Sequence, residues 1–183
     1  MASDIDIASN ALLRIGANPI SSFTEGGAEG TVADNLYEPT IRDLFTKARW
    51  RFASAKRQLA RLTATPLNEF KYAYQLPSDM LYMYRVYPYA DYEIVSDKLY
   101  SDETEVYIDY IYRPDESKWP AYFQLLAEYK LASEFALSIT DNRALNELYE
   151  TKAMMQLRAA RHADSQGRPV DGIQRFKYVD VRG

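Results

Sequence analysis

The sequence predicts an α+β protein: a mainly α-helical bundle of about four helices, with an inserted small antiparallel β-sheet and an extended C-terminal tail. Apolar residues recur with the helical period near both ends of the chain and with a period of two in the middle. A stretch with glycines and a proline follows the last helical segment. The expected boundaries are residues 1–69 and 114–163 for the bundle, residues 70–113 for the β insert, and residues 164–183 for the tail.

The first helix is expected from about Asp4 to Ile15. Ser3 or Asp4 can cap its free backbone N–H groups, and Gly16 is a natural stop. The segment that follows contains Pro19 and several glycines, so it is expected to form a loop.

A second helical region is expected to begin near Thr31 and to continue to Leu62, because apolar residues step by three and four positions over many turns. Pro39 lacks an N–H group and is expected to kink this region or to begin a new helix. The basic residues lie mostly off the apolar stripe, which predicts a long amphipathic helix with cationic outer faces. We interpret Trp50 and Phe52 as packing groups rather than base-stacking platforms, since Phe52 lies on that stripe.

Four short runs between residues 70 and 112 predict the strands of the insert. The run 92–100 is divided by Ser96 and Asp97, which suggests a hairpin. Short connections between the runs predict antiparallel pairing. In the run 81–87, strict alternation would give two faces, one with Leu81, Met83, Arg85 and Tyr87 and the other with Tyr82, Tyr84 and Val86.

Two helices are expected after the proline-containing segment 113–120. Asp141 lies between them and is a good cap for the second helix. The expected apolar face of that helix is formed by Leu145, Leu148, Tyr149, Met155 and Ala159.

The composition of this 183-residue chain is ordinary for a globular protein except for its 16 tyrosines, a residue that suits half-exposed surfaces and interfaces. The sequence contains no cysteine, which excludes disulfides, thiolate catalysis and zinc sites with cysteine ligands. No stretch approaches the roughly 18 apolar residues of a membrane span, and the N-terminal segment is too weakly apolar for a signal peptide. We therefore expect no membrane partner, and a location in the cytoplasm or in a particle assembled there.

The charge is acidic overall but unevenly distributed. A net charge of −4 argues against a general nucleic-acid binder, since such domains are normally basic. From Arg42 to Arg61, however, every charged residue except Asp43 is basic. From Asp79 to Glu116, acidic residues dominate.

No pattern in the sequence indicates an enzyme. The single histidine, His162, lies late in the last expected helix and is interpreted as a cap or surface group. The nucleophile, phosphate-loop and dinucleotide-binding motifs that could have indicated catalysis are missing. We expect no catalytic residue, no metal site and no cofactor.

Several pieces occur in a characteristic order: "NALLRIGANPISSF", "ADNLYEPTIRDLFTKARWRFASAKRQL", "YAYQLPSDML", an acidic strand pair ending in "YIYRPDE", and two closing helices. This ordered set resembles the head–tail adaptor (connector) family of tailed bacteriophages, tail tubular protein A-like. The resemblance covers roughly residues 4–163. Its most specific pieces are W-x-F-A at residues 50–53 and "AYQLPSD" at residues 73–79.

The resemblance implies a helical bundle carrying an antiparallel β insert, with no catalysis and no cofactor. It implies a virion protein at the head–tail junction, assembled in the host bacterial cytoplasm. About twelve copies would form a ring beneath the portal protein and join it to a tail nozzle, tail-tube or terminator protein. Double-stranded DNA would pass through the channel of this ring without sequence-specific binding.

A closed ring requires two dissimilar surfaces on each subunit. We expect the opposed charge blocks to help orient neighbouring copies. Solvent, a protein neighbour and DNA remain open as alternatives for the cationic residues, as do a docked strand and a frayed terminus for the tail. The predicted interface residues are Arg49, Lys56, Arg57 and Arg61 in the basic region, and Ile173, Arg175, Phe176, Tyr178 and Val179 in the tail.

Two other functions also remain open. The chain could be a nucleic-acid-binding regulatory protein that uses a basic helix over residues 42–62, although net acidity and the lack of a helix-turn-helix pattern speak against this. It could also be a carbohydrate-binding module that uses surface tyrosines of the β insert.

Overall fold

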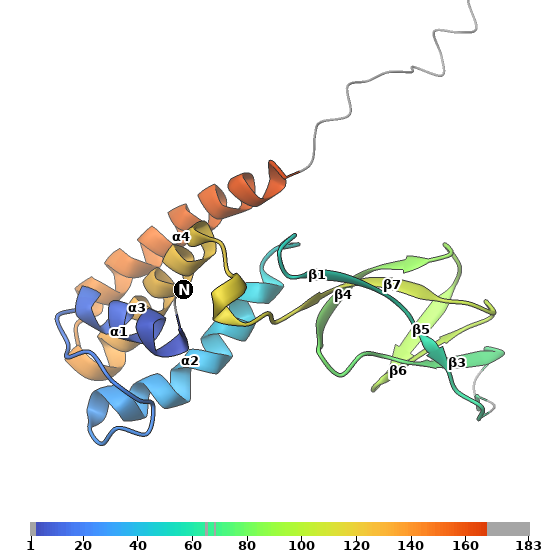
Figure 1. Cartoon of the computed structure of the whole chain (residues 1–183), viewed down its shortest axis with the longest axis horizontal. Helices are drawn as coiled ribbons and strands as arrows, with labels where there is room; N and C mark the ends of the chain where they lie inside the picture. The colour runs from blue at the N-terminus through green and yellow to red at the C-terminus, as the bar shows by residue number, and fades with distance from the viewer. Residues whose placement is uncertain (1–2, 65, 68, 168–183) are drawn as a thin grey trace, which may run out of the picture.

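The helices form one body and the strands another, and the chain crosses between them twice (Figure 1). The computed structural model describes residues 3–64, 66–67 and 69–167. These residues form four α-helices and two small antiparallel sheets, which confirms the predicted α+β class. Nearly all of the predicted tail, residues 168–183, lies outside the described residues. The helices are α1 (Asp4–Arg14), α2 (Ala28–Thr46), α3 (Ala121–Thr140) and α4 (Arg143–Ser165), with a short 3-10 helix, η1 (Glu116–Lys118).

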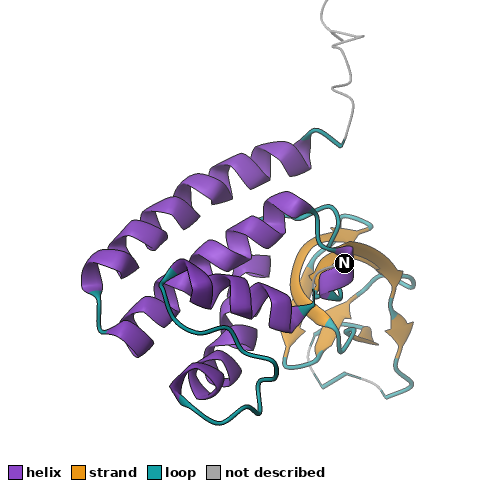
Figure 2. Cartoon of the chain, turned by 60° about the vertical axis from the view of Figure 1, so that its left-hand side comes forward, coloured by secondary structure: helices purple, strands orange, loops and turns teal. Residues whose placement is uncertain are grey.

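Helix α3 is the centre of the bundle and packs against α1, α2 and α4 (Figure 2). Helix α1 begins as predicted. The Ser3 hydroxyl accepts a hydrogen bond from the Asp6 N–H at 3.1 Å, and the Asp6 carboxylate accepts one from the Ser3 N–H at 2.8 Å. This reciprocal capping box satisfies two N–H groups at the start of the helix. Helix α4 is capped by Asn142 rather than Asp141, which instead adopts the left-handed conformation (φ 47°) that ends α3.

The prediction of a long second helix that reaches Leu62 is wrong. Helix α2 begins at Ala28, continues through Pro39 and ends at Thr46. A turn follows, and residues 54–58 and 60–61 are strands, so the β region begins well before residue 70. The cause is Trp50, which is fully buried and donates its indole N–H to the Leu44 carbonyl at 3.0 Å. Ile41 and Leu44, before this turn, pack in the core of the bundle, whereas Ala55 and Leu59, after it, pack in the core between the sheets. Their helix-like spacing in the sequence is therefore a coincidence.

The β region consists of two sheets, both antiparallel as predicted. One sheet has the order β1–β7–β4 and the other β2–β3–β6–β5. Met80 at the start of β4 pairs with Tyr112 at the end of β7, so both of these strand ends lie next to the helices. The strands are β1 (Ser54–Gln58), β2 (Ala60–Arg61), β3 (Tyr72–Gln75), β4 (Met80–Tyr87), β5 (Tyr92–Val95), β6 (Lys98–Ser101) and β7 (Tyr107–Tyr112).

Strand β4 does not alternate strictly as predicted. Its register against β7 shifts twice, between Met80 and Tyr82 and again between Met83 and Arg85. Each shift places one extra residue on the strand, so its inward residues are three apart instead of two. Met80, Met83 and Val86 therefore face the core between the sheets, while Tyr84 and Arg85 share the opposite face.

Helix α4 buries a narrower face than its sequence predicts. Its buried apolar residues are Tyr149 and the small residues Ala153 and Ala160. Leu148 and Met155, expected on the apolar face, are 47% and 64% exposed. Helix α3 is the main neighbour of α4 and covers only one side of it, so these two side chains remain on the surface.

Candidate functional site

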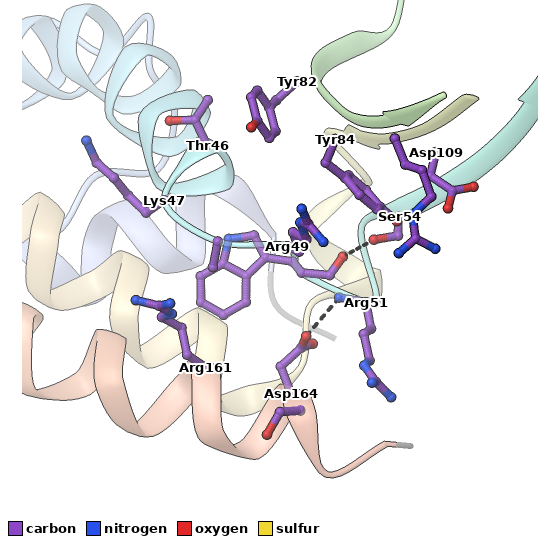
Figure 3. Close-up of a pocket in the computed structure, with 14 residues that line it drawn as sticks. Thr46, Lys47, Arg49, Arg51, Ser54, Tyr82, Tyr84, Asp109, Arg161 and Asp164 are labelled. Carbon is purple, nitrogen blue, oxygen red and sulfur yellow. Dashed lines mark hydrogen bonds between the residues drawn. The ribbon is translucent and has the colours of Figure 1, made fainter. Parts of the chain in front are cut away.

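A groove lies where the end of α2, the turn after it, strands β4 and β7 and the end of α4 meet (Figure 3). Its volume is about 640 Å³, within the range of roughly 300–1,000 Å³ typical of ligand sites. We call it the cationic groove. Its charged lining residues are Lys47, Arg49, Arg51, Arg85, Asp109, Arg161 and Asp164, and its exposed or half-buried aromatic residues are Tyr82 and Tyr84.

The turn after α2 positions two arginines at the groove. Trp50 between them is buried, with its ring edge-on to Phe123 at 5.1 Å between centroids. Because this indole points into the bundle, the flanking Arg49 and Arg51 are left exposed at the rim. The hydroxyl of Ser54 donates to the Trp50 carbonyl at 2.6 Å and fixes the end of the turn. As predicted, Trp50 and Phe52 pack in the core, with their ring centroids 6.1 Å apart.

Asp164 fastens the turn to the helices. Its carboxylate is buried and accepts hydrogen bonds from the Arg51 backbone N–H and from the Tyr122 hydroxyl, both at 2.8 Å. Burial raises the pKa of Tyr122, and its hydrogen bond to the Asp164 carboxylate raises it further. Tyr122 therefore keeps its proton and remains a donor to Asp164.

Strand β4 forms the opposite wall. The Arg49 guanidinium lies over the Tyr84 ring with its central carbon 4.8 Å from the ring centroid. Arg85 donates to the Tyr87 hydroxyl at 2.6 Å, and this hydrogen bond raises the pKa of Arg85 above its ordinary value. The irregular register of β4 brings Tyr84 and Arg85 to this face together.

Within the part of the chain that the structure describes, the groove carries five cationic side chains and two carboxylates, for a formal charge of +3. Lys47 has an ion pair with Asp43 at 2.8 Å. Among the described residues, Arg49, Arg51 and Arg161 form no ion pair with a carboxylate. Guanidinium groups match carboxylates and phosphates in geometry, so the groove is suited to an anionic ligand.

The four basic residues predicted as an interface do not lie together. Arg49 lines the groove, and Lys56 lies on β1 with its amine 3.7 Å from Asp109. Arg57 is its strand neighbour and faces the other side of the sheet, 3.9 Å from Asp79. Arg61 lies on β2 over the Tyr72 ring. The predicted tail residues Ile173, Arg175, Phe176, Tyr178 and Val179 lie outside the described residues.

Three of the groove arginines were not in the predicted set. Arg51 belongs to the same basic stretch as Arg49, and it would have been found by asking which residues flank a buried tryptophan. Arg85 is one of the few cations in an acidic segment, which is a usable signal. Arg161 comes from the far end of α4, and nothing in its local sequence links it to the others.

A second polar cluster holds the two bodies together. Arg113, just after β7, forms an ion pair with Glu116 at 2.5 Å and with Glu38 of α2 at 2.9 Å. Glu116 also accepts a hydrogen bond from the Tyr37 hydroxyl at 3.1 Å, and burial raises the pKa of Tyr37. All of these groups come from segments at the junction, which indicates a structural role.

Two further observations concern possible chemistry. His162 is exposed near the end of α4, with its Nε2 atom 3.2 Å from the Gln166 side-chain nitrogen. In the part of the chain that the structure describes, no group of three or more His, Asp or Glu side chains could hold a metal ion. Within the same residues, none of the helices is both long and apolar enough to cross a membrane.

Comparison of the chain with models of known protein families, and with curated proteins, finds no match in either set. A functional assignment therefore depends on the resemblance of the quoted sequence pieces, on the fold and on the surfaces of the molecule.

Proposed function

We propose that the chain is a structural virion protein, a head-to-tail adaptor that forms a ring of about twelve copies between the portal protein and the tail. One observation carries the proposal: four helices form one body, and two antiparallel sheets are inserted between α2 and α3. This is the architecture that the sequence resemblance implies. In this role the protein acts through its shape and its contacts, with no reaction of its own.

Exposed apolar residues on the bundle support an assembly role. Leu148, Met154 and Met155 lie on α4 and are 47%, 55% and 64% exposed. Large exposed apolar side chains that gather on one element are typical of interaction surfaces. This α4 surface supplies one of the two contact areas that a ring subunit needs.

Strand β5 supplies a second and different surface. It is the outer strand of its sheet and pairs only with β6 among the described strands. Tyr92, Ile94 and Val95 are all more than 40% exposed. A sheet edge with apolar side chains tends to recruit another chain unless something covers it. Two unlike surfaces allow the head-to-tail contacts that close a ring.

The overall charge is compatible with a channel for DNA. At −4 per chain, twelve copies would carry a net charge of about −48. A continuous basic wall would instead hold the phosphates tightly and release counterions. The alternative of a regulator that reads DNA with a helix over residues 42–62 loses its basis, because residues 54–58 and 60–61 of that segment are strands.

The test is co-assembly with the portal protein of the phage genome that encodes the chain. Purified chain is mixed with portal rings, and the products are separated by size and imaged by electron microscopy. We expect a second ring stacked on the portal, with a mass close to twelve chains. The variant Met155→Glu tests the α4 surface and Ile94→Lys tests the β5 edge, with Arg143→Glu as an exposed control. Portal rings that bind no wild-type chain would contradict the proposal.

A further inference from the structure

We propose that the cationic groove is a docking site for an acidic turn of a second copy of this chain. The acidic turn, residues 102–106 between β6 and β7, contains Asp102, Glu103 and Glu105. The inference rests on the proposed function in one respect, because ring assembly supplies the reason for copies to meet head to tail. It goes further by naming the two surfaces that meet.

The groove has cations that no carboxylate of the described residues neutralises. Arg49, Arg51 and Arg161 are exposed and form no ion pair with a carboxylate within the described residues. The first two are presented on a turn fixed by buried Trp50 and by Asp164. The backbone of this turn is therefore fixed, and the Arg49 guanidinium also lies over the Tyr84 ring, so Arg49 loses less freedom when it binds a carboxylate.

The acidic turn is the complementary surface. It contains three carboxylates and no basic residue, for a formal charge of −3 against +3 for the groove. The Asp102 Oδ1 atom accepts a hydrogen bond from the Lys71 backbone N–H at 2.9 Å, and the Oδ2 atom lies 4.0 Å from the Lys71 amine. Both side chains are more than half exposed, so this ion pair is worth little and leaves Oδ2 available to a stronger partner.

The acidic turn cannot reach the groove of its own chain. Tyr107, the first residue of β7, pairs with Gln58 and Tyr87, the last residues of β1 and β4. The acidic turn therefore lies at the end of this sheet away from the helices (Figure 1). The groove, which is lined partly by residues of α2 and α4, lies at the end next to the helices. A contact between the two must form between copies, and because the surfaces differ it is of the head-to-tail kind that closes rings.

Carboxylates fit the groove better than a nucleic-acid backbone. The buried carboxylates of Asp109 and Asp164 line it as well, and they would repel a continuous row of phosphates. The acidic chain as a whole also repels a polyanion at long range. The three carboxylates of the acidic turn match in number the three groove arginines that are unpaired among the described residues, and they add no excess negative charge.

Charge reversal of the groove tests the proposal first. The groove variant carries Arg49→Glu, Arg51→Glu and Arg161→Glu. Self-association is measured by analytical ultracentrifugation at chain concentrations up to about millimolar. The salt concentration is either about 10 mM, where the Debye screening length is about 30 Å, or about 1 M, where it is about 3 Å. Wild-type chain is expected to associate in dilute salt, and the groove variant at least about tenfold more weakly.

The reciprocal turn variant carries Asp102→Lys, Glu103→Lys and Glu105→Lys, and it is expected to lose association equally. In a mixture of the two variants, the negative groove of one meets the positive turn of the other, and the unchanged groove meets the unchanged turn, so both contacts are attractive again. Combining the two sets of substitutions in one chain also makes its contacts attractive. Association of the mixture at wild-type strength is the specific expectation. Recovery also shows that both variants fold, which near-ultraviolet circular dichroism checks independently.

A matched control reverses three cations elsewhere, Arg42→Glu, Lys118→Glu and Arg143→Glu, with the same change in net charge. Because its groove and acidic turn are unchanged, this control is expected to self-associate like the wild type. Wild-type chain that stays monomeric in dilute salt, or a mixture that fails to associate, would overturn the proposal. So would a groove variant that loses only the binding of a short DNA duplex while its self-association is normal. If the chain co-assembles with the portal but charge exchange does not restore self-association, the adaptor function stands and this inference is removed. If charge exchange restores self-association but the chain does not bind the portal, this inference stands and the adaptor function is removed.

Discussion

The two bodies of the protein differ in how much core each one has. Among the described residues, the bundle core contains 25 buried residues, whereas the core between the sheets contains eight. The bundle core includes a cluster of aromatic rings, Phe45, Trp50, Phe52, Trp119 and Phe123, with centroid distances of 4.7–6.1 Å for the contacting pairs. The sheet region has fewer buried side chains and an exposed apolar edge at β5.

This difference indicates where each body obtains its stability. Buried apolar area is the main favourable term in folding, and the bundle has enough of it to hold its own shape. The sheet region therefore depends more for its stability on its attachment to the helices at the Arg113 cluster and on any partner that covers the β5 edge. In an assembly, the bundle would act as the rigid frame and the sheets as the part completed by neighbours.

The largest expected effect is the loss of Trp50, which belongs to the bundle core but fixes the turn that leads into the sheets. Trp50→Ala removes a fully buried indole and its hydrogen bond to Leu44. We expect the free energy of unfolding to fall by about 3–5 kcal/mol. Urea denaturation followed by circular dichroism measures it. Tyr89→Ala, at an 84% exposed site, is the control and is expected to cost less than about 0.5 kcal/mol.

A truncation in the sheet core is expected to cost less. Leu99→Ala removes a fully buried side chain from β6, and we expect a loss of about 2–3 kcal/mol because two small sheets can partly close the cavity. Hydrogen exchange read by mass spectrometry sharpens the comparison. Faster exchange in β3 and β6 with unchanged protection in α3 would show that the sheets open by themselves. Equal acceleration in both bodies would contradict this division.

The junction can be weakened without touching either core. Glu116→Gln removes the charge that pairs with Arg113 and weakens acceptance from the Tyr37 hydroxyl. We expect a loss of about 1.5–3 kcal/mol in the free energy of unfolding. Glu147→Gln removes a 72% exposed carboxylate from α4 and serves as the control. A value for Glu116→Gln as small as the control would mean that the sheets are held by apolar packing alone.

The smallest effect is a pH dependence confined to the bundle. Burial tends to raise the pKa of Glu150, but hydrogen bonds from Lys130 and Ser133 outweigh burial and hold this pKa below its ordinary 4.5. A carboxyl group with a lowered folded-state pKa stabilises the protein above its unfolded pKa. That contribution disappears as the pH falls through the folded value.

The matched variant is Glu150→Gln. At neutral pH, the free energy of unfolding of the wild type is expected to exceed that of the variant by about 0.5–1 kcal/mol, a value kept small by the partial exposure of the carboxylate. In strong acid, the two free energies are expected to be equal. Thermal melts of both proteins across the acidic range measure the difference. A difference that is constant with pH would show that Glu150 acts by packing rather than through its charge.

Local sequence is sufficient to predict the elements whose periodicity and end signals agree. The Ser3 cap, the α+β class, the antiparallel strands and the closing helices were all readable, because each depends on neighbours within a few residues. The helix predicted over residues 47–62 does not form, because the burial of Trp50 overrides the local periodicity.

Tertiary structure alone decided the rest. The register shifts in β4 depend on β7, and the exposure of Leu148 and Met155 depends on which helices cover α4. The cationic groove unites Arg49, Arg85 and Arg161, which lie on a turn, a strand and a helix far apart in the chain. Local residue preferences act over a few positions, whereas a groove is defined by how separate elements pack, so no local pattern contains it.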